Sequence, residues 1–270
     1  MRLTEEQLTT RLAGSRKYRR LGDETLRRMA AWALARYPNG EAEKAAKRKL
    51  HQVYGAYLHA DLPHWSADWG YPELMAALRT HASTAERMHL LDGFFASIWQ
   101  RTDVPESVLD IACGLNPLSR PWMSLPAGTD YLGVDIDSGV TALINHISEH
   151  FGWSTHAVQH DVLCRPVDYR ADVALVLKTL PCLEQQQSGA AVDLLRSLRC
   201  PWVVVSFPTR TLGGRGVGME AHYRQFMNGC LDTLGWDADS WLSGDELLYA
   251  LNTRQEPDAE DASPVGRADG

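Results

Sequence analysis

The segment from Val108 to Leu118 constrains the fold of this chain more than any other. Its sequence, Val-Leu-Asp-Ile-Ala-Cys-Gly-Leu-Asn-Pro-Leu, begins with strand-forming residues and then reaches Gly114, where the backbone can approach a neighbour closely. Two later segments, 131–135 and 155–161, are also strand-like and also end in an aspartate. Three strands with a carboxylate at or near their ends predict an open α/β sheet that binds a ligand beyond the carboxyl ends of its strands.

Hydrophobic periodicity divides the chain into three regions. Residues 1–100 carry only helical patterns, with helices predicted over 24–36 and 41–58. From residue 101 to 253 strands alternate with helices, which predicts an α/β domain with a mostly parallel, doubly wound sheet. The predicted strands are 108–112, 131–135, 156–159, 173–177, 202–207, 236–240 and 246–251. Residues 254–270 are rich in Asp, Glu, Pro and Gly, and we expect a disordered tail there.

The turn after the first predicted strand indicates which kind of nucleotide the sheet binds. A dinucleotide fold carries Gly-x-Gly-x-x-Gly at this turn, whereas this chain has Gly114 alone, with Pro117 soon after it. A ligand with adenine and ribose but no phosphates needs fewer glycines. Asp135 is placed to bind ribose hydroxyls, and Asp161 is placed to reach the adenine amino group. S-adenosylmethionine fits this description, and we predict it as the cofactor.

Composition excludes several classes of protein. The chain has 270 residues with 44% hydrophobic content, which is ordinary for a globular protein. No apolar run approaches the roughly 20 residues of a membrane span, and the N-terminus is too polar for a signal peptide. The five cysteines lie far apart without a Cys-x-x-Cys pair, so neither a zinc ribbon nor a disulfide framework is indicated. We therefore expect a cytoplasmic protein with no bound metal and no membrane contact.

Charge is distributed unevenly along the chain, although the net charge is −7. Residues 1–50 hold 13 Lys and Arg against 6 Asp and Glu, whereas residues 101–270 hold 12 against 23. A basic region on an acidic body suggests that this region meets a polyanion, and the aromatic ring of Tyr18 among the cations favours nucleic acid. The alternative is that these cations only solvate helix faces. The candidate phosphate-binding residues are Arg16, Lys17, Arg19, Arg20, Lys47 and Arg48.

Four motifs together resemble one enzyme family. They are His81-Ala-Ser-Thr-Ala-Glu-Arg87, the segment 108–118, Gln159-His-Asp-Val-Leu-Cys164 and the long motif 205–216, Val-Ser-Phe-Pro-Thr-Arg-Thr-Leu-Gly-Gly-Arg-Gly. In these motifs the chain is similar to the aminoglycoside-resistance 16S ribosomal RNA methyltransferases of the Arm/Sgm/Rmt family. The similarity runs from about Ser15 to Leu251. It implies a class I (Rossmann-like) S-adenosylmethionine-dependent methyltransferase sheet behind an all-helical N-terminal extension that recognises rRNA.

The resemblance also implies a reaction and a partner. Members of this family methylate N7 of the guanine at nucleotide 1405 of 16S rRNA in the assembled 30S subunit, and this modification confers aminoglycoside resistance. We expect the protein to act as a monomer. Two alternatives remain open at this stage: methylation of adenine N1 in the same decoding region, and a ribosome-binding factor without catalytic activity.

The family's cofactor contacts transfer to named positions of this sequence. His81, Thr84 and Arg87 would contact the methionine end, and a Ser83–Glu86 capping box predicts a helix that starts near Thr84. The other implied cofactor residues are Tyr57, Asp110, Ala112, Gly114, Asn116, Asp135, Ile136, Gln159, Asp161, Val162, Leu177 and Leu180.

The acceptor base has its own candidate residues. Lys178 would lie beside the transferred methyl group, and Phe207 with Pro208 could face a base that is flipped out of its stack. For Phe207 and Pro208 the alternative is a role in the hydrophobic core. Arg210, just before the glycine-rich segment 212–218, and Arg215 within it could pair with RNA phosphates. We interpret Cys182 as a small buried residue rather than a nucleophile, and we name no certain catalytic residue.

Overall fold

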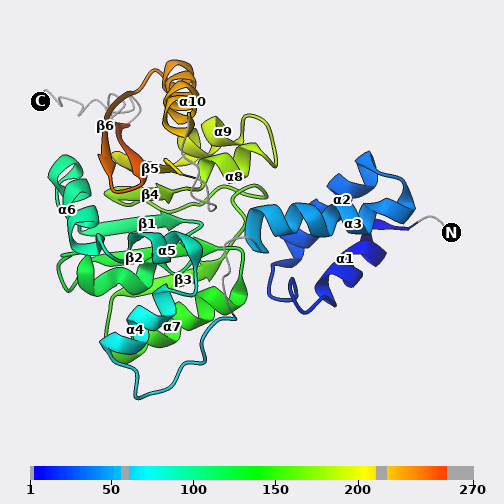
Figure 1. The fold of residues 1–270 in the computed structure, drawn as a ribbon, viewed down its shortest axis with the longest axis horizontal. Helices are drawn as coiled ribbons and strands as arrows, with labels where there is room; N and C mark the ends of the chain where they lie inside the picture. Colours follow the sequence, from blue (N-terminus) through cyan, green and yellow to red (C-terminus); the bar gives the residue numbers. More distant parts are fainter. Residues whose placement is uncertain (1–2, 56–60, 211–217, 254–270) are drawn as a thin grey trace, which may run out of the picture.

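The chain folds into a body built on a β-sheet, with a small bundle of helices at one side of it (Figure 1). A computed structural model describes residues 3–55, 61–210 and 218–253. Tyr57, Arg215 and the expected tail 254–270 therefore lie outside the described residues. Within the described ranges, no helix is both long enough and apolar enough to cross a membrane.

The N-terminal bundle has a hydrophobic core of its own. It comprises α1 (Glu5–Ala13), α2 (Asp23–Arg36), α3 (Asn39–Leu50) and the π-helical turn η1 (His51–Gly55). A capping box starts α1: the Thr4 hydroxyl accepts a bond from the Gln7 amide, and the Gln7 side chain accepts one from the Thr4 amide. The bundle core includes Leu8, Leu12, Leu26, Met29, Ala33 and Leu50. The helix predicted over 24–36 is confirmed, whereas the α-helical part of 41–58 ends at Leu50.

Seven strands of the described residues form one sheet, in the order β3-β2-β1-β4-β5-β7-β6. Neighbours among β1 to β5 pair in parallel, and β7 pairs antiparallel with both β5 and β6. The bounds are β1 (Ser107–Ile111), β2 (Asp130–Asp135), β3 (Thr155–Gln159), β4 (Val173–Leu177), β5 (Trp202–Pro208), β6 (Asp237–Ser243) and β7 (Glu246–Asn252). All seven predicted strands are confirmed, with small shifts at their ends.

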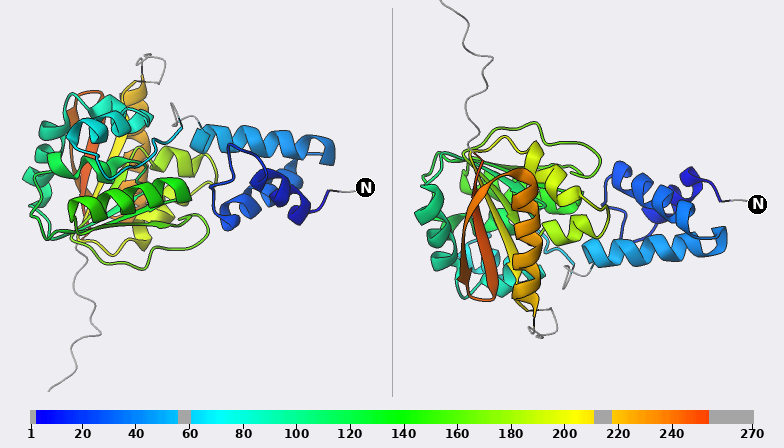
Figure 2. Two further views of the ribbon diagram at one scale, coloured as in Figure 1. Left: turned by 90° about the horizontal axis from the view of Figure 1, so that it is seen from below. Right: turned by 90° about the horizontal axis from the view of Figure 1, so that it is seen from above.

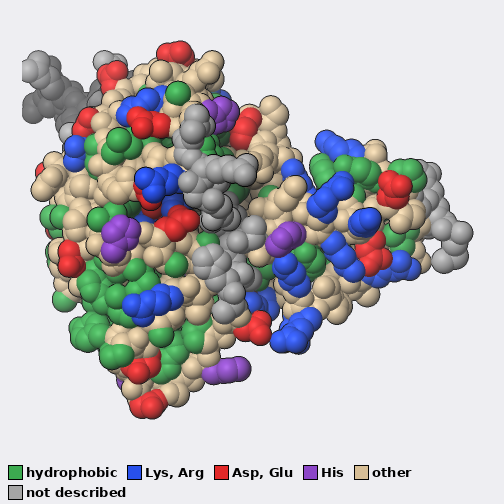
Figure 3. All heavy atoms as spheres, viewed as in Figure 1, with side chains coloured by type: hydrophobic (Ala, Val, Ile, Leu, Met, Phe, Trp, Pro, Cys, Tyr) green, Lys and Arg blue, Asp and Glu red, His purple; other side chains and the backbone are tan. Residues whose placement is uncertain are grey.

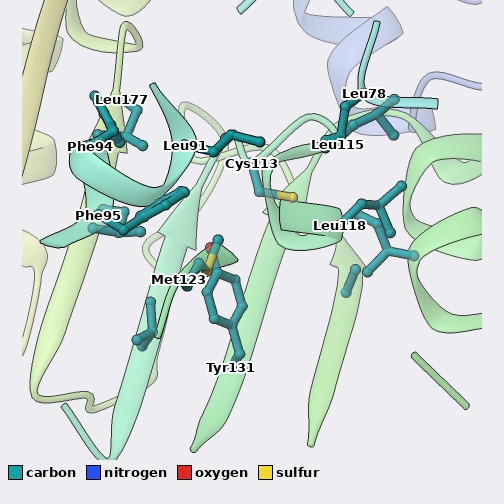
Figure 4. Packing of buried hydrophobic residues seen from close by; sticks show 14 of the residues in the cluster. Leu78, Leu91, Phe94, Phe95, Cys113, Leu115, Leu118, Met123, Tyr131 and Leu177 are labelled. Carbon is teal, nitrogen blue, oxygen red and sulfur yellow. The ribbon is translucent and has the colours of Figure 1, made fainter. Parts of the chain in front are cut away.

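Helices cover both faces of the sheet (Figure 2). Alternate residues of each strand enter opposite cores: Val108 of β1 packs on one face, and Leu109 on the other. The first face is covered by α4 (Tyr71–Leu78), α6 (Leu91–Thr102) and α7 (Ser138–Phe151), and the second by α8 (Leu180–Glu184), α9 (Ala190–Ser197) and α10 (Met219–Leu234). Figure 4 shows the first core, where Phe94, Phe95, Met123 and Tyr131 pack together.

The helical region predicted for residues 1–100 divides between two cores. Residues 8–54 supply the core of the N-terminal bundle, whereas Leu74, Leu91 and Phe94 pack on the sheet. The segment that contains α4 and α6 thus belongs to the sheet domain, although it carries no strand. In the described residues, the separate helical bundle therefore covers a shorter stretch than the helical region 1–100 that the sequence pattern indicates.

A short antiparallel bridge joins the bundle to the sheet domain at Leu21 and Asp137. The Ser138 amide donates to the Arg20 carbonyl (2.9 Å), and the Arg20 guanidinium lies 3.2 Å from the Asp137 carboxylate. The hydroxyl of Tyr54 also donates to Asp137. Because Asp137 caps the start of α7 as well, one buried carboxylate fixes the bundle to the end of β2.

Candidate active site

A cavity with about 900 Å³ of empty space lies at the carboxyl ends of β1, β2 and β4. This is where an open parallel sheet binds its ligands. The predicted site residues that line it are His81, Ala112, Gly114, Asp135, Ile136, Asp161, Val162, Leu177 and Lys178. Apolar walls from Ile136, Val162 and Leu183, interrupted by a few polar groups, suit a flat heteroaromatic ring.

Asp135 presents a carboxylate in a fixed orientation at the end of β2. One oxygen accepts a bond from the Gly114 amide and the other from the Asp137 amide, both at 2.9 Å. Each oxygen keeps a second lone pair for a ligand, which suits two adjacent ribose hydroxyls. Burial raises the pKa of the Asp135 carboxyl to about 6, although the backbone bonds oppose this shift.

Gly114 allows the close backbone approach that the sequence indicates. Its φ of +50° is unfavourable for residues with a side chain. A Cβ atom at this position would lie only 2.8 Å from Cε1 of His81, so the imidazole ring occupies the space of the missing side chain. The loop after β1 and the residue before α5 (Ala82–Arg87) are therefore packed against each other at the cavity wall.

Asp110, Asn116 and Arg87 form a buried polar network and do not line the cavity in the described structure. The Asp110 carboxylate accepts bonds from the Tyr131 hydroxyl (2.7 Å) and the Asn116 amide (2.8 Å). The Arg87 guanidinium donates to the Asn116 side-chain oxygen at 3.4 Å. Burial raises the pKa of Asp110 to about 6, while the bonds from Tyr131 and Asn116 lower it.

Two cations and two carboxylates meet beside the cavity. Arg87 pairs with Glu246 through two bonds, Nε to Oε1 at 2.6 Å and Nη2 to Oε2 at 3.0 Å. Lys178 lies with its Nζ 3.1 Å from the same carboxylate and also pairs with Glu86. The Ser206 hydroxyl donates to Glu246 at 2.8 Å. Burial alone would raise the pKa of Glu246, but Arg87, Lys178 and Ser206 lower it below its usual value, so this carboxylate is ionised.

Backbone strain is found at two residues of this edge. Ala112 and Lys178 follow β1 and β4, and their φ angles are +51° and +58°. Residues with side chains rarely adopt this conformation, which costs free energy unless the surroundings hold it. The Lys178 amide is held by the Ser206 carbonyl of the neighbouring strand at 3.0 Å. Strained positions of this kind are concentrated at functional sites.

The capping box predicted for Ser83 and Glu86 is wrong. α5 begins at Ala82, and its first turn packs against His81 rather than being capped by Ser83. The Ser83 hydroxyl bonds with Nδ1 of His81 at 2.9 Å, and Glu86 pairs with Lys178. The Thr84 hydroxyl donates to backbone carbonyls of Leu78 and His81, so Thr84 is buried and does not line the cavity.

The predicted adenine contacts also hold the helical bundle in place. Asp161 lines the cavity, but one of its oxygens accepts bonds from Thr25 (2.9 Å) and Arg28 (2.8 Å) of α2. Gln159 does not line the cavity, because its side-chain amide donates to the Arg20 carbonyl at 2.9 Å. This edge of the sheet therefore both contacts the bundle and forms part of the cavity wall.

Several cavity residues carry no signal in the sequence. Arg28, Val53 and Tyr54 come from the helical bundle and reach the cavity only because the bundle packs against the sheet. Cys182, which we interpreted as a buried residue, is half-buried and lines the cavity, with its sulfur 3.8 Å from the Lys178 carbonyl.

Two predicted site residues belong to the hydrophobic core instead. Leu180 is fully buried and packs inside the second core. Phe207 is also fully buried, with its ring stacked 4.9 Å from that of Tyr223, so the prediction that it faces a base is wrong. Pro208, the next residue, does reach the surface and lines a second cavity.

Basic side chains gather on the helical bundle (Figure 3). Arg16, Lys17, Arg19 and Arg48 are exposed there. Arg20 differs, because it pairs with Asp137 at the domain junction and is only one-third exposed. Three of the predicted cations have acidic neighbours at the surface: Arg16 pairs with Asp61, Lys47 with Glu43 and Arg210 with Asp245. The exposed cations therefore form a surface that is open to a polyanion.

Known proteins match this fold and this chain over most of its length. A family model for the ribosomal RNA methyltransferase FmrO matches residues 14–250. A Frankia casuarinae protein named 16S rRNA (guanine(1405)-N(7))-methyltransferase is 39% identical and is matched over 95% of its length and 92% of this chain. A Serratia marcescens protein of the same name is 38% identical, over 96% of its length and 90% of this chain.

A solved structure agrees with these relatives. The crystal structure of the 16S rRNA methyltransferase RmtF in complex with S-adenosyl-L-homocysteine superposes with a TM-score of 0.83 at 38% identity, covering 93% of this chain and 99% of that one. The family and the fold predicted from the sequence are thereby confirmed, with the helices preceding the methyltransferase sheet. The chain belongs to the FmrO family of ribosomal RNA methyltransferases.

Proposed function

We propose that this enzyme transfers the methyl group of S-adenosylmethionine to N7 of guanine 1405 of 16S rRNA in the assembled 30S subunit, and so confers resistance to aminoglycosides. The observation that carries the proposal is the Asp135 carboxylate, held at the strand end inside the cavity of an rRNA methyltransferase. Relatives whose names specify this guanine match the chain over about nine-tenths of its length. The 30S subunit is cytoplasmic, so we place the enzyme there, acting as a monomer.

The residues around the cavity suit the parts of this cofactor. Asp135 would accept the ribose hydroxyls, and Ile136 with Val162 would flank the adenine, whose amino group would approach Asp161. At the methionine end, Asp110 and Arg87 lie behind the cavity wall, so they would act on the ammonium and carboxylate groups through their charges. When bound, S-adenosylmethionine supplies an electrophilic methyl group.

The protein's chemical task is alignment rather than proton transfer. Guanine N7 carries a free lone pair and no proton, so its attack on a methyl group needs no general base. Side chains must hold the base in line and exclude water, which accelerates a reaction by fixing its geometry. Glu246 and Glu86 both pair with Lys178, and these carboxylates offset cationic charge in this region while positive charge moves to the purine.

Mapping the modified nucleotide tests this function. Methylated 30S subunits should release an RNA fragment after borohydride and aniline treatment, because N7-methylguanine makes the backbone cleavable at that guanine. Methylation of adenine N1 would instead stop primer extension without either reagent. A ribosome-binding factor without activity would incorporate no labelled methyl group at all.

Asp135→Ala is expected to weaken S-adenosylmethionine binding by about 1.5–3 kcal/mol, the usual range for hydrogen bonds to a charged group. Isothermal titration calorimetry measures the change, with a thermal melt to verify folding. Asp130→Ala is the matched control: Asp130 starts the same strand, where its carboxylate is exposed and bonds Tyr169, so cofactor affinity should not change. Equal affinities in the two folded variants would contradict the assignment.

The pH dependence of cofactor binding should follow the two carboxylates whose pKa values are raised. Asp110 and Asp135 have pKa values of about 6 in the unliganded protein. In the proposed site, Asp135 accepts the ribose hydroxyls and Asp110 attracts the ammonium group most strongly when both carboxylates are ionised. Affinity should therefore fall about tenfold from pH 7.5 to pH 5.5. The free energy of unfolding should change in the opposite direction and increase as the pH falls through about 6. A carboxyl group whose pKa is raised by folding costs stability when it must ionise, and this cost is lost as the group becomes protonated. A constant affinity over this range, measured by calorimetry, would exclude ionisation of these groups as a requirement.

The exposed cations of the bundle are expected to bind RNA phosphates. Replacement of Arg16, Lys17, Arg19 and Arg48 with Glu should weaken 30S binding at least about 100-fold at 0.1 M salt while leaving cofactor affinity intact. Wild-type binding should also weaken steeply with salt. Arg196→Glu with Arg199→Glu, two exposed cations of the sheet domain, is the control that should bind normally. If the control loses as much binding as the bundle variant, the effect is one of net charge and not of this surface.

A further inference from the structure

We infer that the second cavity holds the target guanine and that Glu86 is its specificity-determining residue, an inference that rests on the proposed function. This cavity has about 700 Å³ of empty space, and its lining residues include members of α5, α8, α10 and the end of β5. Ser83, Lys178 and Cys182 line both this cavity and the cofactor cavity. The two cavities are therefore adjacent, as the transfer of a methyl group between two ligands requires.

Lys178 and Glu86 differ in their positions relative to the two cavities. Lys178 lines both cavities, whereas Glu86 lines only the second. The ammonium of Lys178 is in contact with the Glu86 carboxylate. In the proposed arrangement, a base that extends from the cofactor cavity into the second cavity meets Lys178 first and then Glu86.

Guanine presents complementary groups in the same order. N7 and O6 are neighbouring acceptors on one edge, and the donors N1–H and N2–H₂ follow on the Watson–Crick edge. With N7 toward the cofactor cavity, O6 lies where Lys178 can donate to it. The N1–H and N2–H₂ groups then face Glu86, whose carboxylate can accept both bonds. Flipped bases are commonly recognised through this edge.

The charges around Lys178 permit Glu86 to change partner. Glu246 stays against Lys178 with its side chain 5% exposed, so the ammonium keeps one buried counterion. The Glu86 side chain is 42% exposed, so an incoming base can reach it. Glu86 can therefore exchange its bond to Lys178 for bonds to guanine without leaving the ammonium unpaired.

Adenine would be rejected at both positions. Its N6 amino group would replace O6 and would face the ammonium, so two donors would meet. Its N1 is an acceptor and would face the Glu86 carboxylate, so two acceptors would meet. Buried polar groups left without partners discriminate strongly between bases or substrates.

The walls of the second cavity suit a planar base. Tyr223 lines it, and the Tyr223 ring is supported from behind by the buried Phe207 ring at 4.9 Å with a 21° interplanar angle. Pro181 and Pro208 add rigid apolar surface. Phe207 thus supports the base pocket indirectly, although it does not reach it.

Glu86→Gln tests this assignment with two substrates. The 30S subunits are reconstituted with 16S rRNA that carries guanosine or inosine at nucleotide 1405, because inosine lacks only the N2 amino group. Wild-type kcat/KM should fall about 10–100-fold on inosine, the effect of one hydrogen bond to a charged group. Glu86→Gln should lose a similar factor on guanosine but discriminate less than about threefold between the two substrates, with unchanged cofactor affinity.

Glu220→Gln is the matched control for Glu86→Gln. Glu220→Gln removes an exposed carboxylate of α10 that pairs with Arg224, and it should keep the wild-type preference for guanosine. A purely structural role for Glu86 would lower the rates on guanosine and inosine equally. If Glu86→Gln keeps the wild-type preference for guanosine over inosine, this inference is wrong but the proposed function is unaffected. If the wild type does not methylate guanosine subunits at all, the proposed function fails and this inference fails with it.

Discussion

The parallel pairing of β1 with β2 and β4 is the constraint on which the whole site depends. Because Ile111 pairs with Val134 and the three strands run in one direction, the residues that follow them meet at one edge of the sheet. Ala112, Asp135 and Lys178 are brought together in this way from three distant segments. The hydrogen-bond ladder therefore orients the polar groups, and the loops adopt strained angles at Ala112 and Lys178 to complete the cavity.

Glu246 completes the edge from the far end of the chain. β7 is antiparallel to β5, so its first residue lies beside the last residues of β5. There its buried carboxylate pairs with both Arg87 and Lys178, and Glu86 supplies the second negative charge beside Lys178. The antiparallel hairpin of β6 and β7 therefore supplies a counterion for Lys178, a residue that lines both cavities.

The helical bundle connects the first cavity to the surface that we propose binds RNA. Arg28 of α2 bonds with Asp161 at the cavity, and Arg20 bonds with Asp137 at the junction. The exposed cations Arg16, Lys17 and Arg19 lie in the same bundle. A surface proposed to bind ribosomal RNA is thus attached directly to the residues proposed to hold adenine, so the position of the bundle affects both ligands.

The sequence alone determined the strands, the parallel sheet and the position of Asp135, because strand periodicity and strand ends are local properties. Motifs quoted from the chain also identified the family. Only the tertiary structure decided which polar side chains meet: the contacts of Glu246 with Lys178 and of Arg28 with Asp161 join residues 68 or more positions apart. Local rules failed where packing competed with them, at Ser83, which bonds His81 instead of capping a helix, and at Phe207, which is buried by three neighbouring rings.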